Sequence, residues 1–478
     1  MASPRTSNAS TSSSSCDCSK EREAFIASLD LAAIQTLALK TRQSQLAQQP
    51  EPSSRDPTQH ELACTVQFLT QGGSNVLYDL RFSAPDNSHW VIRIPLASRT
   101  WTALAARRMH HDVVAQQYIL ARTAVPIPRI HASACSADNA LGHPYVLMDF
   151  VEGTRLVDVW NEPGWWMDGR TRERTLESLA CVMVELATLE FPQIGCLELP
   201  GSPGEPHGIV PFPSLLDPLN PSQPDAPTPE LEDEDDRGPF TSTHAYLSAL
   251  LAATRAQRDD PTLALLQLLL SALPSRAYDR APFTLGHPDF DAQNVFLDAR
   301  TGAVAALVDW DGVAAAPREL GALTYPMWLT VDWDPFAYAG YRAHQPHCDG
   351  EETLRALRRF YTGAVDRASG EGRRWGRVTR NSHLVSTLEI GITNELSRLE
   401  VVYRLGKYVF GSGRLVFEML EGIEHCAWYN RKEEDVAEVI GEQTYVDFEI
   451  SECDLLVSDR MGLVRGAGEG TGGHRERL

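Results

Sequence analysis

The sequence lacks the features of a membrane or secreted protein. No stretch approaches the roughly 18 consecutive apolar residues that a membrane span requires. Residues 1–20 are rich in Ser, Thr, Ala and Asn and contain no apolar segment of the kind a secretory signal needs. Basic residues are sparse there, so no Arg-rich amphipathic presequence is predicted. We therefore expect a cytoplasmic protein with no membrane partner.

The cysteines are not grouped along the sequence, and basic residues are fewer than acidic ones. Nine cysteines are scattered over 478 residues, and the one close pair, Cys16 and Cys18, has no second pair beside it. This pattern predicts neither a disulfide framework nor a zinc site. The chain has 43 Lys and Arg against 64 Asp and Glu, which gives a formal net charge of −21. Such a balance argues against nucleic acid as the main partner.

What the chain does contain is enough apolar sequence for several structural units, with 43% hydrophobic residues. Taken in order, we predict a disordered N-terminus (1–20), a leading helix and linker (21–60), a small β-rich lobe (61–152), a larger helical lobe (153–455) and a flexible tail (456–478). Proline recurs over residues 200–240, and acids fill six of the seven positions from Glu230 to Asp236. The insertion 200–240 is predicted to be an exposed tether; the alternative is that residues 225–236 dock a protein partner.

The β-rich lobe is predicted to be a five-stranded antiparallel sheet with one inserted helix. Strand patterns occupy residues 64–69, 76–82, 90–95, 129–132 and 145–148, and a helical pattern fills 103–122. A glycine turn joins the first two strands through Gly72, Gly73, Ser74 and Asn75. Backbone N–H groups in such a turn can cover phosphates, although a purely structural hairpin turn has the same sequence.

Arg93 is a charged residue among the apolar residues of the third strand. Burying a guanidinium without an anionic partner is costly. One reading is a phosphate contact held by a carboxylate of the following helix, for which Asp112 is the best candidate. The other reading is a cation on an edge strand that faces water.

The strongest chemical pattern lies in residues 285–312. The motif His287-x-Asp289-x-x-x-x-Asn294 is followed, after an apolar run, by Asp309, fifteen positions beyond Asn294. Turn-forming residues at 298–302 predict a hairpin between them. Such a hairpin would place Asn294 and Asp309 side by side at the base of a cleft.

These residue types suit phosphoryl transfer from a magnesium nucleotide. A carboxylate such as Asp289 can orient or deprotonate an incoming hydroxyl, while the oxygens of Asn294 and Asp309 can share a hard cation. His287 is expected to hold the loop by hydrogen bonds and not to bind metal. The aromatic run at residues 325–333 is read as core, with a ligand cage as the alternative.

In this order the elements resemble the aminoglycoside phosphotransferase and choline kinase-like family of the protein-kinase-like fold, over residues 64–333. The motif around Asp289 and Asn294 and the Val308-Asp309-Trp310-Asp311 segment carry most of the resemblance. It is closest in detail to fungal phosphotransferase-family proteins of unassigned substrate. The resemblance implies an α+β, bilobal protein-kinase-like fold, with a small five-stranded antiparallel N-lobe and a larger, mainly helical C-lobe.

The resemblance also implies ATP and Mg2+ as cofactors. Asp289 would be the catalytic base, and Asn294 and Asp309 the magnesium ligands. An interlobe hinge at residues 145–151 would meet adenine through backbone groups around Met148 and Phe150.

Three positions depart from the family pattern. The usual strand lysine is replaced by Arg93, and the usual helix glutamate by Asp112. Pro288 stands where glycine is common. The leading hypothesis is an ATP-dependent phosphotransferase acting on a hydroxyl of a small-molecule acceptor. The alternative is a nucleotide-binding pseudokinase or scaffold with little or no turnover, which Arg93 and the acidic insertion motivate. A phosphoryl-transfer assay discriminates between the two.

Overall fold

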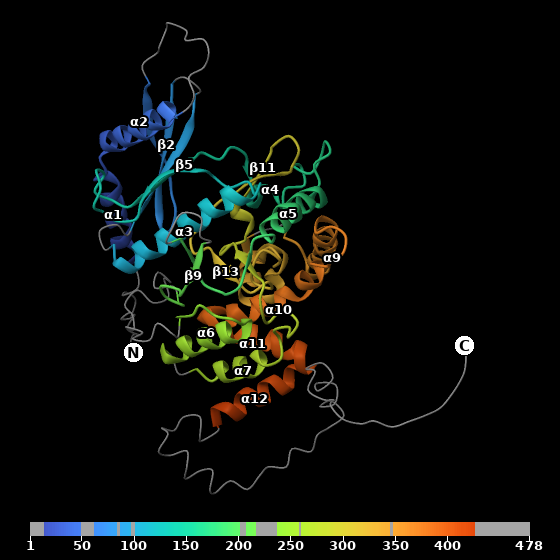
Figure 1. Cartoon of the computed structure of the whole chain (residues 1–478). Coiled ribbons are helices and arrows are strands. Elements are labelled where there is room, and N and C mark those ends of the chain that lie inside the picture. Colours follow the sequence, from blue (N-terminus) through green and yellow to red (C-terminus); the bar gives the residue numbers. More distant parts are fainter. Residues whose placement is uncertain are drawn as a thin grey trace, which may run out of the picture.

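A computed structural model describes residues 14–48, 62–83, 87–96, 101–200, 207–216, 237–257, 260–344 and 348–425. The acidic segment 225–236 and the tail 456–478 lie outside these ranges. The described residues form a sheet-containing N-lobe and a larger helical C-lobe (Figure 1). This arrangement confirms the predicted α+β bilobal fold.

The N-lobe contains the predicted five-stranded sheet. Its strands are β1 (Cys64–Gln71), β2 (Asn75–Phe82), β3 (His89–Pro95), β4 (Ile130–Ala134) and β5 (Tyr145–Asp149). They are antiparallel in the order β1-β2-β3-β5-β4, and α3 (Ala103–Arg122) is the inserted helix. Since β3 lies at the centre of the sheet, Arg93 is not on an edge strand.

Two N-terminal helices pack on this sheet, α1 (Ser14–Ala27) and α2 (Leu31–Gln48). Ile34, with no exposed surface, shares a core cluster with Leu80 and Ile92 of the sheet. The helices are therefore part of the N-lobe, and α1 begins inside the segment predicted to be disordered. In the described part of the chain no single helix is long and apolar enough to cross a membrane, although α1 and α2, bent by 57°, pass that test as a pair.

The C-lobe begins with β6 (Thr154–Arg155), α4 (Leu156–Val159), α5 (Arg172–Leu186), β7 (Glu190–Phe191), β8 (Cys196–Glu198) and β9 (Gly208–Val210). It continues with α6 (Thr243–Gln257), α7 (Thr262–Leu270), β10 (Phe283–Gly286), β11 (Val295–Leu297), β12 (Val304–Leu307) and β13 (Ala314–Ala316). The last helices are α8 (Pro335–His344), α9 (Glu351–Ala368), α10 (Gly376–Thr393), α11 (Glu395–Phe410) and α12 (Gly413–His425). Short 3-10 turns cover Ala292–Asn294, Met327–Leu329 and Val331–Trp333.

The insertion 200–240 is not a tether throughout. Within it β9 pairs with β8, and Phe240 forms a bridge with Ile194 in the C-lobe. Both ends of the insertion are thus fixed to the lobe.

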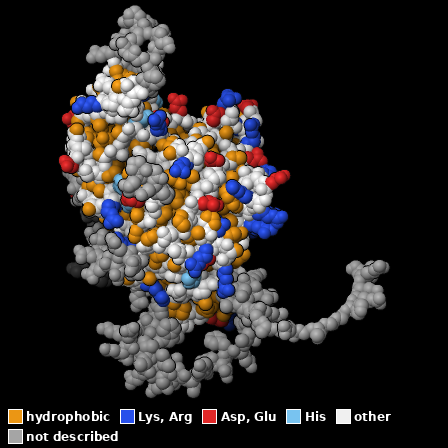
Figure 2. Space-filling view, viewed as in Figure 1, with side chains coloured by type: hydrophobic (Ala, Val, Ile, Leu, Met, Phe, Trp, Pro, Cys, Tyr) orange, Lys and Arg blue, Asp and Glu red, His pale blue; other side chains and the backbone are white. Residues whose placement is uncertain are grey.

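The aromatic run at residues 325–333 belongs to the core, as expected. Tyr325 and Trp328 are buried in a core cluster that also contains Phe290 and Trp310. Trp333 is buried in the cluster of α6, α7, α10 and α11. Basic and acidic side chains are scattered over the face in Figure 2, so the net negative charge does not make this face uniformly acidic.

Candidate active site

The predicted hairpin brings Asn294 and Asp309 together. Strands β11 and β12 pair antiparallel, and the turn closes where the Gly302 N–H donates to the Asp298 carbonyl at 2.8 Å. Gly302 adopts a φ of +72°, which favours glycine. Beyond the strands, the Val308 N–H donates to the Asn294 carbonyl at 3.0 Å. Asp309, the next residue, therefore begins beside Asn294.

Asp289 is held by two side-chain amides. Gln293 Nε2 donates to Asp289 Oδ2 at 2.7 Å, and Asn294 Nδ2 donates to the same oxygen at 2.8 Å. Asn294 Nδ2 also lies 2.8 Å from the Asp289 carbonyl oxygen. Both amides bind Oδ2, and Oδ1 has no hydrogen-bond partner among the described residues. Sequence reasoning missed Gln293, because no spacing rule predicts its contact.

His287 has the loop-holding role expected of it. Its Nε2 donates to the Val308 carbonyl at 2.9 Å, and its ring centroid lies 4.5 Å from that of Trp310. Burial lowers the pKa of His287 from 6.5 to about 4, so the ring is neutral near pH 7. A neutral ring bound to a carbonyl positions the segment before Asp309 and touches no reacting group itself.

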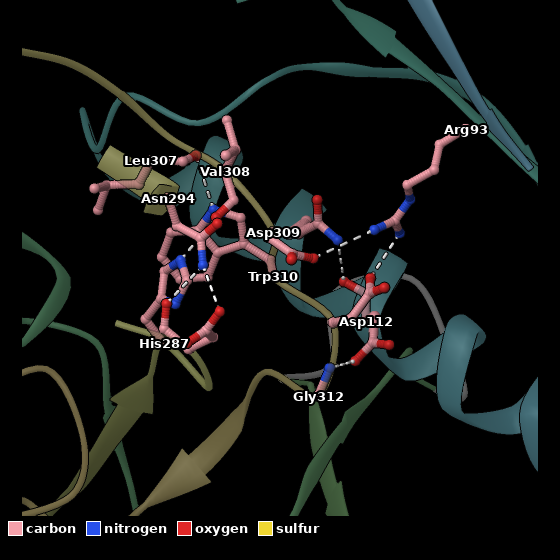
Figure 3. Close-up of polar contacts among 12 residues, drawn as sticks. Arg93, Asp112, His287, Asn294, Leu307, Val308, Asp309, Trp310 and Gly312 are labelled. Atoms are coloured by element: carbon pink, nitrogen blue, oxygen red, sulfur yellow. Dashed lines mark hydrogen bonds and ion pairs between the residues drawn. The ribbon is translucent and has the colours of Figure 1, made fainter. Parts of the chain in front are cut away.

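Arg93 reaches from the N-lobe into this site, as Figure 3 shows. Its guanidinium lies 2.6 Å from Asp311 Oδ1 and 3.7 Å from Asp309 Oδ1, and its side chain is 14% exposed. Among the described residues it forms no ion pair with Asp112. The predicted Arg93–Asp112 pair is therefore wrong, because the turn after β12 offers Arg93 two nearer carboxylates.

Asp112 instead binds the backbone of that turn. Its Oδ1 accepts from the Gly312 N–H at 2.8 Å, a contact that joins α3 to the C-lobe (Figure 3). Burial, and then the nearby Asp311 carboxylate, raise the pKa of Asp112 well above its usual range. From the sequence, Asp311 could bind metal through water or cap a turn, and neither reading included its contact with Arg93.

The charges of the site fit a bound cation. Asp309 and Asp311 share the single guanidinium of Arg93. Burial, followed by the charge of Asp311, raises the pKa of Asp309. Asp309 also has a φ of +65°, uncommon for a residue other than glycine, so the turn fixes it at some cost in backbone strain.

The protein alone does not enclose a metal ion. No group of three or more His, Cys, Asp or Glu side chains in the described ranges could hold one. Mg2+ is usually held by one or two carboxylates, with phosphates and waters completing its shell. The oxygens of Asn294 and Asp309 match that limited donor set.

The glycine turn and the hinge complete the predicted nucleotide residues. Gly72 N–H donates to the Asn75 carbonyl at 2.8 Å, and the turn, which includes Gly73 and Ser74, is mostly exposed. Its position over phosphates stays a prediction, as does the role of Met148.

Phe150 offers no free amide to adenine. Its N–H donates to the His89 carbonyl at 3.0 Å, and its ring stacks on that of His89 at 3.8 Å. The Asp149 N–H is likewise bound, to the Arg129 carbonyl at 3.0 Å. Contact of adenine with backbone groups around Met148 and Phe150 stays a prediction, and Val151 is the first hinge residue beyond these two bound amides.

Comparison with known proteins identifies the family. The sequence profile of the phosphotransferase enzyme family matches residues 65–357, more than half of the chain. The chain belongs to this family. The match includes both lobes of the site, from β1 to α9. It confirms the resemblance to the phosphotransferase family.

The chain is also similar to fungal proteins. It is 23% identical over 336 residues to a subtelomeric hrmA-associated cluster protein of Aspergillus fumigatus, covering 57% of this chain and 62% of that protein. It is 25% identical over 128 residues to the mitochondrial "altered inheritance of mitochondria protein 9" of Lodderomyces elongisporus, covering 26% and 19%. The matches thus span less than two thirds of these relatives.

Solved structures with a similar arrangement include two phosphotransferases. One is the macrolide 2'-phosphotransferase MphH of Brachybacterium faecium, 12% identical, with 76% of this chain and 94% of that one covered and a TM-score of 0.38. The other is an aminoglycoside-3'-phosphotransferase of type VIII, 15% identical, with 67% and 92% covered and a TM-score of 0.35.

Proposed function

We propose that the protein transfers the γ-phosphoryl group of ATP to a hydroxyl of a small molecule. The observation that carries this proposal is the convergence of Asp289, Asn294 and Asp309 through one hairpin and one clamped loop. Asp289, with Oδ2 occupied by two amides, presents Oδ1 to the acceptor hydroxyl. There it orients the hydroxyl and takes its proton as the new bond to phosphorus forms.

Asn294 and Asp309 would hold magnesium. The ion, when bound, neutralises charge on the phosphates of the nucleotide. His287 keeps the segment before Asp309 in place through the Val308 carbonyl. Arg93, which is buried and charged, supplies the cation that the family pattern assigns to the phosphates.

The nucleotide would lie between the lobes. The backbone of Val151 is the proposed adenine contact, and the glycine turn from Gly72 to Asn75 would cover the phosphates. Cytoplasmic location and a protein partner for the acidic segment 225–236 stay predictions.

Substituting Asp309 by Ala tests the proposal. The full chain is titrated with ATP with and without Mg2+, and thermal stability and phosphate release are both measured. We expect the wild type to be stabilised by ATP with Mg2+ and to turn it over, and Asp309→Ala to lose that turnover. An Asp309→Ala variant with wild-type turnover would refute the assignment, and nucleotide binding without turnover by the wild type would favour the pseudokinase alternative.

A further inference from the structure

The strand cation of this protein has a different carboxylate partner from the one its sequence suggests. Arg93 Nη2 lies 2.6 Å from Asp311 Oδ1, a short charge-assisted contact, whereas its distance to Asp309 is 3.7 Å. The Asp311 side chain is 43% exposed and the Arg93 side chain only 14%. The contact therefore joins a largely buried guanidinium on β3 to an acid at the mouth of the C-lobe site.

The position of Asp112 explains why the helix carboxylate does not take that role. Its Oδ1 is already bound by the Gly312 N–H at 2.8 Å. Gly312 has a φ of +89° and follows Asp311 directly in the chain. By binding that amide, Asp112 of α3 fixes the turn that carries Asp311. Asp311 then fixes the guanidinium of Arg93.

The exposure of the two acids agrees with these contacts. Asp112 is buried and accepts from a backbone N–H, whereas Asp311, with 43% of its side chain exposed, meets the guanidinium. A carboxylate that keeps part of its surface in water loses less solvation in such a contact than a buried one.

We propose that Asp311 is the positioning residue that holds Arg93 for the nucleotide phosphates, and that Asp112 supports it by fixing the turn that carries Asp311 through the Gly312 amide. The inference rests on the proposed nucleotide site and extends it to a residue outside the expected lysine–glutamate pattern. The Asp112–Gly312 hydrogen bond and the Asp311–Arg93 ion pair together connect α3, through the turn at residues 309–312, to β3. Nucleotide affinity thereby depends on a contact between the lobes.

A double-mutant cycle on nucleotide affinity tests the proposal. The probe is fluorescent mant-ADP with Mg2+, titrated into the full chain. We expect Arg93→Gln and Asp311→Asn each to weaken binding about tenfold, and Asp311→Asn to have no further effect in the Arg93→Gln background. Fold-changes that multiply in the double variant would overturn the proposal, because the two residues would then act independently.

Two variants of Asp112 separate the connection from a direct ion pair. Asp112→Asn keeps an oxygen for the Gly312 amide and should cost clearly less affinity than Asp311→Asn. Asp112→Leu removes that oxygen and should cost about as much as Asp311→Asn. The opposite ranking, with Asp112→Asn the more damaging than Asp311→Asn, would show that Asp112 pairs with Arg93 directly.

A measurement without nucleotide keeps the inference testable if the proposed function fails. The wild type, the two single variants and the double variant are denatured with urea. Asp311→Asn should lower the urea midpoint of unfolding in the wild type but not in the Arg93→Gln background. Asp158→Asn, which breaks the exposed Arg155 pair at 2.8 Å, is the matched control and should give equal shifts in both backgrounds. Equal shifts for Asp311→Asn would refute the pairing, whether or not nucleotide binds.

Discussion

Substituting His287 by phenylalanine would separate its hydrogen bond from its packing. The new ring can fill the space beside Trp310, but it cannot donate to the Val308 carbonyl, which His287 Nε2 meets at 2.9 Å. Leaving that part-buried acceptor without its donor should cost about 1–2 kcal/mol at pH 7. Since the histidine is neutral in both the folded and the unfolded chain there, the cost at pH 7 contains no charge contribution.

Acidification should change the sign of this difference. Burial lowers the pKa of His287 to about 4 from 6.5, so the unfolded chain binds a proton at a pH where the folded chain does not. Relative to His287→Phe, the wild type therefore loses up to about 3 kcal/mol of stability as pH falls from 6.5 to 4. We expect the two free energies of unfolding to cross near pH 5.

Urea denaturation at several pH values measures this directly. His244→Phe, at an exposed histidine, is the control for the loss of a histidine at the surface. A His287→Phe variant that is as stable as the wild type at pH 7 would refute the hydrogen-bond role. A difference that stays constant between pH 7 and pH 4.5 would refute the buried, neutral histidine.

Three further predictions concern positions outside the catalytic loop. Gly153→Ala should destabilise by about 2 kcal/mol or more, since φ is +140° and a Cβ would lie 2.7 Å from the Leu297 carbonyl oxygen; Gly164→Ala, in open space, should not. Burial raises the pKa of Glu319 from 4.5 to about 7, so its contribution to stability is lost as pH rises from 4.5 through 7. Glu319→Gln should therefore be more stable than the wild type by up to about 3 kcal/mol at pH 8, but by little at pH 4.5. Ile34→Ala should cost about 2–5 kcal/mol in urea denaturation, and Leu31→Ala, at an exposed position, far less.

Local sequence signals were sufficient for much of the fold. Apolar alternation broken by turn residues predicted all five N-lobe strands, and the residues at 298–302 predicted the hairpin that joins Asn294 to Asp309. These signals depend on residues close together in the chain, so they can be read directly from the sequence. The proximity of Asn294 to Asp289 and Asp309 could be predicted for the same reason.

Errors arose where a contact between distant segments decided the outcome. The partner of Arg93 has no local signal in the sequence, because the choice between Asp112 and Asp311 depends on how α3 docks against the turn at Gly312.

Phosphoryl transfer from γ-labelled ATP tests the central claim most directly. Wild type and Asp289→Asn are incubated with a library of small hydroxyl-bearing metabolites and Mg2+, and labelled products are counted. The account predicts a labelled acceptor with the wild type and a loss of about 10²–10⁴ in rate with Asp289→Asn, with mant-ADP binding retained. Equal transfer by Asp289→Asn, or tight nucleotide binding by a wild type that labels no acceptor, would contradict it.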